Sequence, residues 1–286
     1  MQLRFFDHFL HGNNNGWNRK PKVLLQVRHI GRFVARAESE WPLKRTRWTR
    51  LFLQPDGALS SRRSTVKGQI TFEAMGDGVT FLSPPLEQET EITGPSALKV
   101  FVSSSTRDAD LFVVLRVFSP DLKEVVFQGA IDPHTPVAQG WLRASHRKLD
   151  RKLSKPYRPY HSHDEKQPLK RGDIAELDVE IWPTCIVIPE GCRIALTIRG
   201  KDYEYGGASG GRLSNFKNEL KGCGPFLHDD PLDRPAAIFA GATTLHFGGG
   251  RNPYLLLPVI PPKTATRRAD GRRSKRRQAP HSRGRA

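Results

Sequence analysis

Short apolar runs, rich in β-branched and aromatic residues, make up most of this chain. The run over residues 174–181 alternates apolar with acidic side chains, which is the period of a half-buried strand. Turn signals such as Pro-Asp-Gly and Pro-Glu-Gly separate the runs, and few stretches beyond the first helix have a helical period. We predict strands at residues 23–27, 49–53, 69–72, 97–102, 111–118, 174–181, 193–198 and 242–247. Such a chain is expected to be mainly β, as an antiparallel β-sandwich of the jelly-roll, galactose-binding-like type.

The first ten residues differ from this pattern. Leu3, Phe6 and Leu10 fall on one stripe of a helix, with Phe5 and Phe9 beside it. A loop rich in Gly and Asn follows and ends the helical pattern. We therefore predict an amphipathic helix that needs a partner surface.

The last 25 residues form a basic tail. Residues 262–286 hold ten Lys or Arg and one acidic residue, Asp270, and so supply +9 of the net charge of +17. They contain no aliphatic residue larger than alanine, so we predict that they are disordered. The tail is either a solvated or out-of-frame appendage, or a segment that binds nucleic acid or anionic lipid or serves as an address. No nucleic-acid-binding module accompanies it, so nucleic acid is not an expected partner apart from the tail.

The cellular compartment of the protein can be predicted from the length of its apolar stretches and from its cysteines. The apolar stretches fall short of the roughly 18 to 20 residues of a spanning helix, and the N-terminus does not resemble a signal peptide. Cys185, Cys192 and Cys223 make an odd count without a C-x-x-C pair. We predict reduced cysteines, a cytoplasmic protein and no membrane partner.

The segment Gly207-Ala-Ser-Gly-Gly211 matches the G-x-S-x-G pattern of a nucleophile elbow. Asp229, Asp230 or Asp233 and then His246 follow in the order that α/β-hydrolases use. An elbow, however, requires a strand directly before the serine and a helix directly after it. Here the nearest predicted strand ends near residue 198, and four glycines flank Ala208 and Ser209. We interpret the segment as a flexible loop and predict no catalytic residue in this chain.

Two further polar clusters are candidate sites. His161, His163, Asp164 and Glu165 could supply ligands to Zn²⁺, but they lie in a proline-rich loop without an obvious third ligand. We expect these side chains to be polar loop residues that bond the backbone, and we predict no metal and no cofactor.

The segment from Ser103 to Asp110 is a polar loop between two predicted strands. Asp108 and Asp110 could act as an acid/base pair or bind calcium, or they could hold turns together through Asx hydrogen bonds.

Four aromatic residues could form a platform for a sugar or a protein partner: Trp141, Tyr157, Tyr160 and Trp182. For the two tryptophans we expect a place in the core instead.

Six segments between Pro84 and Pro261 form a characteristic set: LKVFVSSSTRDADLFVVLRVFSPD, QGWLRASHRKLD, PYRPYHSHDE, VEIWPT, GCGPFLHDDPLDRP and YLLLPVIP. With this set the chain resembles the C-terminal domain of the X-prolyl dipeptidyl-peptidase and cocaine-esterase (CocE/NonD) hydrolase family. The segment over residues 3–28 resembles the junction where the last helix of the family's α/β-hydrolase domain leads into the β domain.

The resemblance implies that catalysis and substrate-cleft shape are supplied by two different domains. In this family a Ser-Asp-His triad lies in an α/β-hydrolase domain upstream of the junction, and the jelly-roll domain packs on it and shapes the substrate cleft. It implies residues 1–22 as a remnant helix and linker, 23–261 as the jelly-roll domain and 262–286 as the tail. The first helix would then have lost its hydrolase partner, so it should dock on the sandwich or stay exposed.

The resemblance also implies a function. The parent activity is hydrolysis of an X-Pro peptide or an acyl ester, and this chain would be an accessory domain that is inactive alone. Its partners would be an α/β-hydrolase domain and a peptide or ester substrate. We place five residues near the hydrolase-facing surface: Asp108, Asp110, Trp141, His146 and Trp182. The alternatives are a carbohydrate- or partner-binding module, or a truncated gene product.

Overall fold

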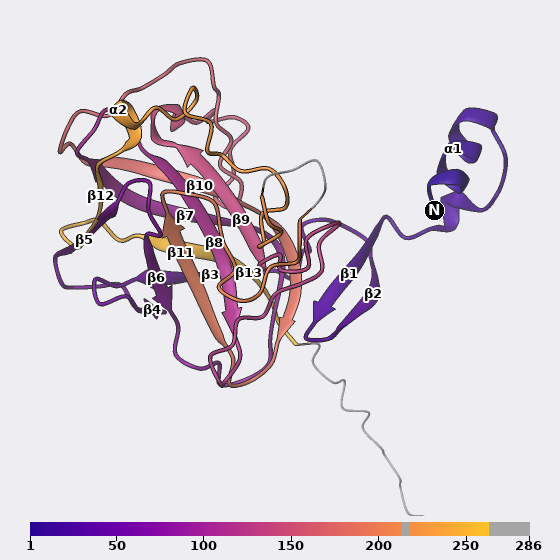
Figure 1. The fold of residues 1–286 in the computed structure, drawn as a ribbon. Coiled ribbons are helices and arrows are strands. Elements are labelled where there is room, and N and C mark those ends of the chain that lie inside the picture. The colour runs from indigo at the N-terminus through magenta and orange to yellow at the C-terminus, as the bar shows by residue number, and fades with distance from the viewer. Residues whose placement is uncertain (213–217, 263–286) are drawn as a thin grey trace, which may run out of the picture.

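Two β-sheets packed face to face form the body of the molecule in the computed structural model, which describes residues 1–212 and 218–262 (Figure 1). The first sheet has the order β2 (Arg32–Glu38), β1 (Val23–His29), β10 (Ala175–Ile188), β7 (Thr90–Ser104), β13 (Tyr254–Ile260), β3 (Arg47–Leu53) and β4 (Leu59–Ser60). β12 (Ala242–Phe247) also pairs with β7, and β5 (Gly68–Glu73) pairs with β12. The second sheet has the order β6 (Val79–Leu82), β11 (Arg193–Arg199), β8 (Asp110–Phe118) and β9 (Ala138–Arg143).

Strand pairing is antiparallel except at the junction of β1 with β10, which are parallel. The expected β-sandwich is therefore confirmed, while its assignment as a jelly roll stays a prediction. The tail predicted over 262–286 lies, from residue 263 on, outside the described residues.

The core lies between the two sheets and follows the alternation in the sequence. On β10, Leu177, Val179 and Ile181 are fully buried, while the acidic residues between them face away from the core. Burial of each such side chain contributes about 1.5 to 3 kcal/mol, which is why the register of this strand is well defined. β8 is buried on both faces, because chain segments also cover the outer face of the second sheet.

Two long connections cover the outer faces of the sheets. The connection after η2 (Ala144–His146) crosses the first sheet, where Tyr157 stacks on Trp48 of β3 with ring centroids 4.3 Å apart. The connection from β11 to β12 contains α2 (Ala236–Phe239) and covers the second sheet, where the Arg234 guanidinium lies 5.0 Å from the centre of the Phe112 ring. Both connections reach the same edge of the sandwich, where β9 approaches β10.

Gly140 permits that approach. A Cβ atom at this position would lie 2.0 Å from the carbonyl oxygen of Glu180, a distance that no side chain tolerates. The glycine therefore lets β9 of the second sheet lie close to β10 of the first, and it brings the next residue, Trp141, beside Trp182.

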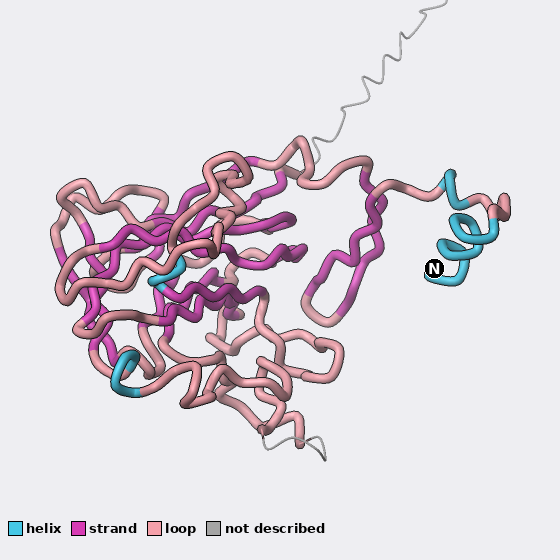
Figure 2. Tube along the Cα trace, turned by 90° about the horizontal axis from the view of Figure 1, so that it is seen from above, coloured by secondary structure: helices cyan, strands magenta, loops and turns pink. Residues whose placement is uncertain are grey.

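The N-terminal helix stands apart from the sheets. α1 (Gln2–His11) ends at Gly12, whose φ of 69° is the left-handed conformation typical of a helix C-cap. Figure 2 shows α1 and η1 (Trp17–Arg19) lying away from the strands. None of the residues of α1 is buried, and Phe5 packs on Trp17 of η1. The helix was expected either to dock on the sandwich or to stay exposed, and in the structure it is exposed. Among the described residues, no helix has the length and apolar character needed to span a bilayer.

All eight predicted strands are present, but β2, β4, β6, β9 and β13 were not predicted. β2 lies at the edge of its sheet, and its side chains are mostly exposed. β13 contains Pro258, a residue that argues against a strand. The pairing of β13 with β7 shifts register between Leu256 and Val259, and this irregularity accommodates the proline.

Candidate functional site

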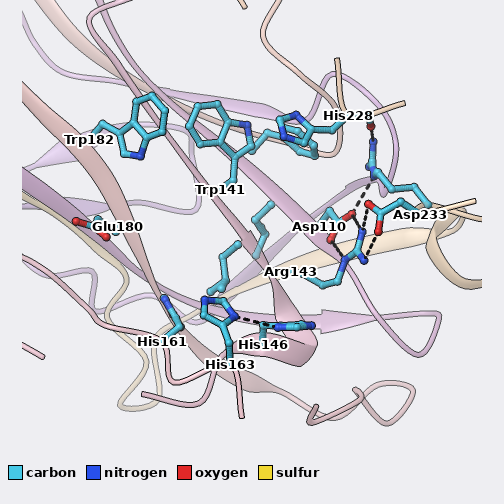
Figure 3. Close-up of a pocket in the computed structure, with 14 residues that line it drawn as sticks. Asp110, Trp141, Arg143, His146, His161, His163, Glu180, Trp182, His228 and Asp233 are labelled. Carbon is cyan, nitrogen blue, oxygen red and sulfur yellow. Dashed lines mark hydrogen bonds and ion pairs between the residues drawn. The ribbon is translucent and has the colours of Figure 1, made fainter. Parts of the chain in front are cut away.

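A pocket of about 480 Å³ opens at the edge of the sandwich where β9 meets β10 (Figure 3). We call it the edge pocket. Its walls come from both sheets and from both covering connections, and its lining residues are Asp110, Leu111, Phe112, Trp141, Leu142, Arg143, His146, His161, His163, Glu180, Trp182, His228, Asp233 and Arg234. Its volume falls within the range of small-molecule sites.

Two tryptophans form one wall of the edge pocket. The ring centroids of Trp141 and Trp182 are 5.1 Å apart, and the rings meet edge to face at 67°. Trp182 is 62% exposed, so the expectation that both tryptophans lie in the core is wrong. Trp182 lies on the outward face of β10, two residues after Glu180, whereas Ile181 between them faces the core.

A network of two arginines and two aspartates forms the end of the pocket. Asp110 accepts hydrogen bonds from Arg143 Nε and Nη2, at 2.9 and 3.0 Å, and from Arg234 Nε at 2.9 Å. Arg143 also donates to both carboxylate oxygens of Asp233, at 3.0 and 2.9 Å. The Asp110 and Asp233 carboxylates raise the pKa of Arg143, and Arg143 lowers the pKa of Asp233.

The same network fixes the connection that covers the second sheet. Arg234 is 5% exposed and donates to the carbonyl oxygens of His228, at 2.6 Å, and Gly200, at 2.5 Å. A buried guanidinium that bonds to Asp110 of β8, to the residue after β11 and to the covering connection holds these segments in one arrangement. The network thus positions one wall of the edge pocket.

His228 extends the tryptophan wall. Its ring centroid lies 6.0 Å from that of Trp141, and its Nδ1 lies 2.9 Å from Asp202 Oδ1. The hydrogen bond to Asp202 raises the pKa of His228 above the ordinary value for imidazole. The imidazolium form is therefore favoured next to the aromatic wall.

Three histidines line the opposite side. His146 Nδ1 and His163 Nδ1 are 3.1 Å apart, so one ring donates to the other. His161 Nε2 is buried without a hydrogen-bond partner, and burial lowers the pKa of this residue. Burial thus disfavours the charged form of the His161 imidazole.

Glu180 lies between Trp182 and His161 in the pocket (Figure 3). Burial raises the pKa of its carboxyl group, and the charge of Arg158 opposes this effect. Within residues 1–212 and 218–262, its carboxylate makes no hydrogen bond or ion pair.

Four of the five residues placed near a functional surface from the sequence line this one pocket: Asp110, Trp141, His146 and Trp182. Asp108 does not. Its Oδ1 accepts hydrogen bonds from the backbone N–H groups of Ala109 and Ser145, both at 2.9 Å, so it holds β8 to η2 behind the pocket.

The remaining sequence candidates are separated. Ser209 Oγ accepts a hydrogen bond from Gly211 N–H at 3.0 Å, within its glycine-rich loop. His246 Nε2 is 2.8 Å from the hydroxyl of Ser103, and Asp233 is paired with Arg143. The structure therefore pairs the apparent elbow serine, acid and base with other residues. The Ser103–His246 contact, on adjacent strands, was not foreseen.

The aromatic and histidine clusters also differ from expectation. Tyr157 stacks on Trp48, away from the edge pocket, and Tyr160 does not line the pocket either, so the four aromatics form no single platform. Asp164 and Glu165 pair with Lys148, and His163 bonds to His146, so the expectation of backbone partners is wrong for them. In the described part of the chain, no group of three or more metal-ligating residues could hold a metal ion.

Sequence reasoning missed four functional-site residues: Arg143, Glu180, His228 and Arg234. Glu180 belongs to the acidic alternation of β10, and Arg143 follows Trp141 by two residues on β9, so strand alternation alone could have placed them on the same faces. The other two depend on a long connection, whose path the sequence pattern does not specify.

Comparisons with known proteins show that this chain is similar to the non-catalytic part of hydrolases. The family model described as the X-Pro dipeptidyl-peptidase C-terminal non-catalytic domain matches residues 15–256. A proposed serine esterase of Mycobacterium tuberculosis is 32% identical over 135 residues, which cover 44% of this chain and 19% of that protein.

Solved structures share the fold. A CocE/NonD family hydrolase from Staphylococcus aureus superposes with a TM-score of 0.77 at 24% identity, covering 91% of this chain and 45% of that one. An aminopeptidase from a marine sediment Thaumarchaeota archaeon superposes with a TM-score of 0.61 at 14% identity, with shares of 91% and 44%. The chain thus spans less than half the length of these relatives.

Proposed function

Because the chain belongs to the family of X-Pro dipeptidyl-peptidase C-terminal non-catalytic domains, we propose that it packs against an α/β-hydrolase domain and forms one wall of its substrate cleft. The reaction would be serine-dependent hydrolysis of a peptide or an acyl ester in the hydrolase domain. This chain would supply shape and charge at the cleft, and no attacking group.

The exposed tryptophan wall of the edge pocket carries this proposal. An aromatic side chain as large as Trp182 is seldom 62% exposed on a folded surface unless a partner or ligand covers it. The wall is rigid, because the Asp110–Arg143–Arg234 network and the glycine contact at Gly140 fix both strands and the covering loop. A rigid, partly apolar surface of this kind suits a permanent interface between domains.

The polar groups of this chain do not support nucleophilic catalysis. Among the described residues, Ser103 and His246 form a serine–histidine contact, but Ser103 is only 8% exposed and lies within the first sheet. Burial lowers the pKa of His246, and no carboxylate of a described residue hydrogen-bonds its ring. A serine nucleophile needs an accessible hydroxyl and a base oriented by a third group.

The experiment is an activity assay with three samples: the chain alone, the α/β-hydrolase domain of this family from the same genome, and their mixture. The substrates are aryl esters and X-Pro-p-nitroanilide. We expect no turnover from the chain alone and a higher kcat/KM for the mixture than for the hydrolase domain. Turnover by the chain alone that disappears in Ser103→Ala or Ser209→Ala would refute the proposal, as would a mixture no more active than the hydrolase domain.

We also propose a cytoplasmic location. All three cysteines are unpaired in the structure, which suits a reducing compartment.

A further inference from the structure

Glu180 differs from the other acidic groups of the edge pocket in making no hydrogen bond or ion pair with a cation of the described residues. Of the three carboxylates that line the pocket, Asp110 and Asp233 are hydrogen-bonded to arginines. Glu180 makes no ion pair with either arginine; the charge of Arg158 acts on its carboxylate, but no hydrogen bond joins these two side chains.

The environment of Glu180 makes its charge costly. The side chain is half-buried, and burial raises the pKa of its carboxyl group. A carboxylate that is partly removed from water and has no hydrogen-bonded counter-charge gains stability when a cation binds to it.

Two indole rings lie beside this carboxylate. Trp182 follows Glu180 by two residues on β10, so the two side chains lie on the same side of the strand, and Trp141 packs edge to face against Trp182. The ring faces of tryptophan attract cations, and a guanidinium can stack on an indole while it pairs with a carboxylate. A carboxylate next to exposed indoles is therefore a site for a cationic group that has an apolar stem.

We infer that the edge pocket receives an arginine or lysine side chain of the hydrolase domain, with its cationic head on Glu180 and its stem against Trp182 and Trp141. This inference rests on the proposed function, because it specifies the chemistry of the partner surface. The Glu180 carboxylate without an ion pair and the exposed indoles beside it in the pocket lining select a cationic partner group over an acidic or purely apolar one.

A first experiment tests cation recognition in the chain alone. Nα-acetyl-arginine amide is titrated into the ¹⁵N-labelled chain, and the indole N–H signals are followed by NMR; Trp182→Phe assigns the Trp182 signal. The matched control ligand is Nα-acetyl-citrulline amide, which has almost the same shape without the charge. We expect saturable shifts of the Trp141 and Trp182 signals with the arginine derivative, at least tenfold weaker binding of the citrulline derivative, and no saturation in Glu180→Gln. Equal responses to the two ligands, or no response of these indoles, would overturn the inference.

A second experiment places the same variants in the complex. Binding of the hydrolase domain is measured by calorimetry for the wild-type chain, for Glu180→Gln, and for the control Glu190→Gln, which changes an exposed glutamate in the turn after β10. Truncating one partner of a desolvated charge pair weakens association strongly, so we expect an increase in Kd of about tenfold or more for Glu180→Gln and none for the control.

The two proposals fail in different ways. If the wild-type chain does not bind the hydrolase domain, the proposed function is wrong. If it binds and Glu180→Gln binds equally well, the accessory role stands and the cationic occupant is wrong. A structure of the complex with an acidic or apolar side chain in the edge pocket would likewise overturn the inference and leave the accessory role intact.

Discussion

Replacing Asp110 by asparagine removes the charge that holds the arginine network together while keeping the volume of the side chain. Asp110 is 9% exposed and accepts three hydrogen bonds from Arg143 and Arg234. In the variant the guanidinium of Arg234, which is 5% exposed, keeps its charge but loses its closest carboxylate. Breaking a buried ion pair by removing one partner costs about 3 to 5 kcal/mol.

The matched control is Asp233→Asn. Asp233 binds the same Arg143, but its side chain is 62% exposed, and an exposed ion pair of this kind contributes about 0.2 to 1 kcal/mol. The free energy of unfolding is measured by urea titration at neutral pH with tryptophan fluorescence. We expect a loss of about 3 to 5 kcal/mol for Asp110→Asn, or roughly 6 to 20 °C in Tm, and of less than about 1 kcal/mol for Asp233→Asn.

A double variant identifies the cause. If the cost comes from the uncompensated charge of Arg234, then adding Arg234→Gln to Asp110→Asn should recover part of the lost stability, so that the two effects are not additive. Equal losses for Asp110→Asn and Asp233→Asn would refute the role of burial in this reasoning.

Three further predictions follow from single contacts. Gly140→Ala should lower the free energy of unfolding by about 2 kcal/mol or more, since its Cβ would lie 2.0 Å from the Glu180 carbonyl oxygen; unchanged stability in urea titration would show that β9 can move away from β10. Asp202→Asn should lower the pKa of His228 in an NMR titration, because the hydrogen bond that the His228 ring donates to the Asp202 carboxylate raises this pKa. Because the pKa of His228 is raised in the folded state, its interaction with Asp202 stabilises the fold below the unfolded pKa of about 6.5, and this stability is lost as pH rises through the folded pKa. The variant should therefore lose more stability at pH 5 than at pH 8. A larger loss at pH 8 would contradict the prediction. Ser209→Ala should change neither the unfolding midpoint nor any esterase readout, because Ser209 Oγ only accepts a hydrogen bond from its own loop; a loss of esterase turnover would show that the loop serine reacts.

The sheet architecture could be predicted because each core strand has its own apolar pattern. Leu177, Val179 and Ile181 alternate with acidic residues, and this alternation is sufficient to predict β10 and its inward face. Apolar alternation cannot predict strands that form mainly because neighbouring strands stabilise them. β9 has a glycine in its centre and β13 a proline, and both form because adjacent strands in the folded sheet supply hydrogen bonds and contacts.

The site was predicted only in part, for a similar reason. Trp141 and Trp182 were singled out from the sequence, but tryptophan is generally expected inside; here Trp182 continues the outward face of β10, and the close approach at Gly140 brings Trp141 beside it. His228 and Arg234 come from a connection without periodic pattern, so no local signal placed them beside the same wall.

Association with a hydrolase domain is the most direct test of the accessory role. Calorimetric titration of the chain with the α/β-hydrolase domain of this family from the same genome should give saturable one-to-one binding. Trp182→Ala should abolish or strongly weaken it without lowering the unfolding midpoint of the chain, because the side chain is 62% exposed. Absence of binding by the wild-type chain, or binding that Trp182→Ala leaves unchanged, would contradict the assignment of the tryptophan wall as the interface.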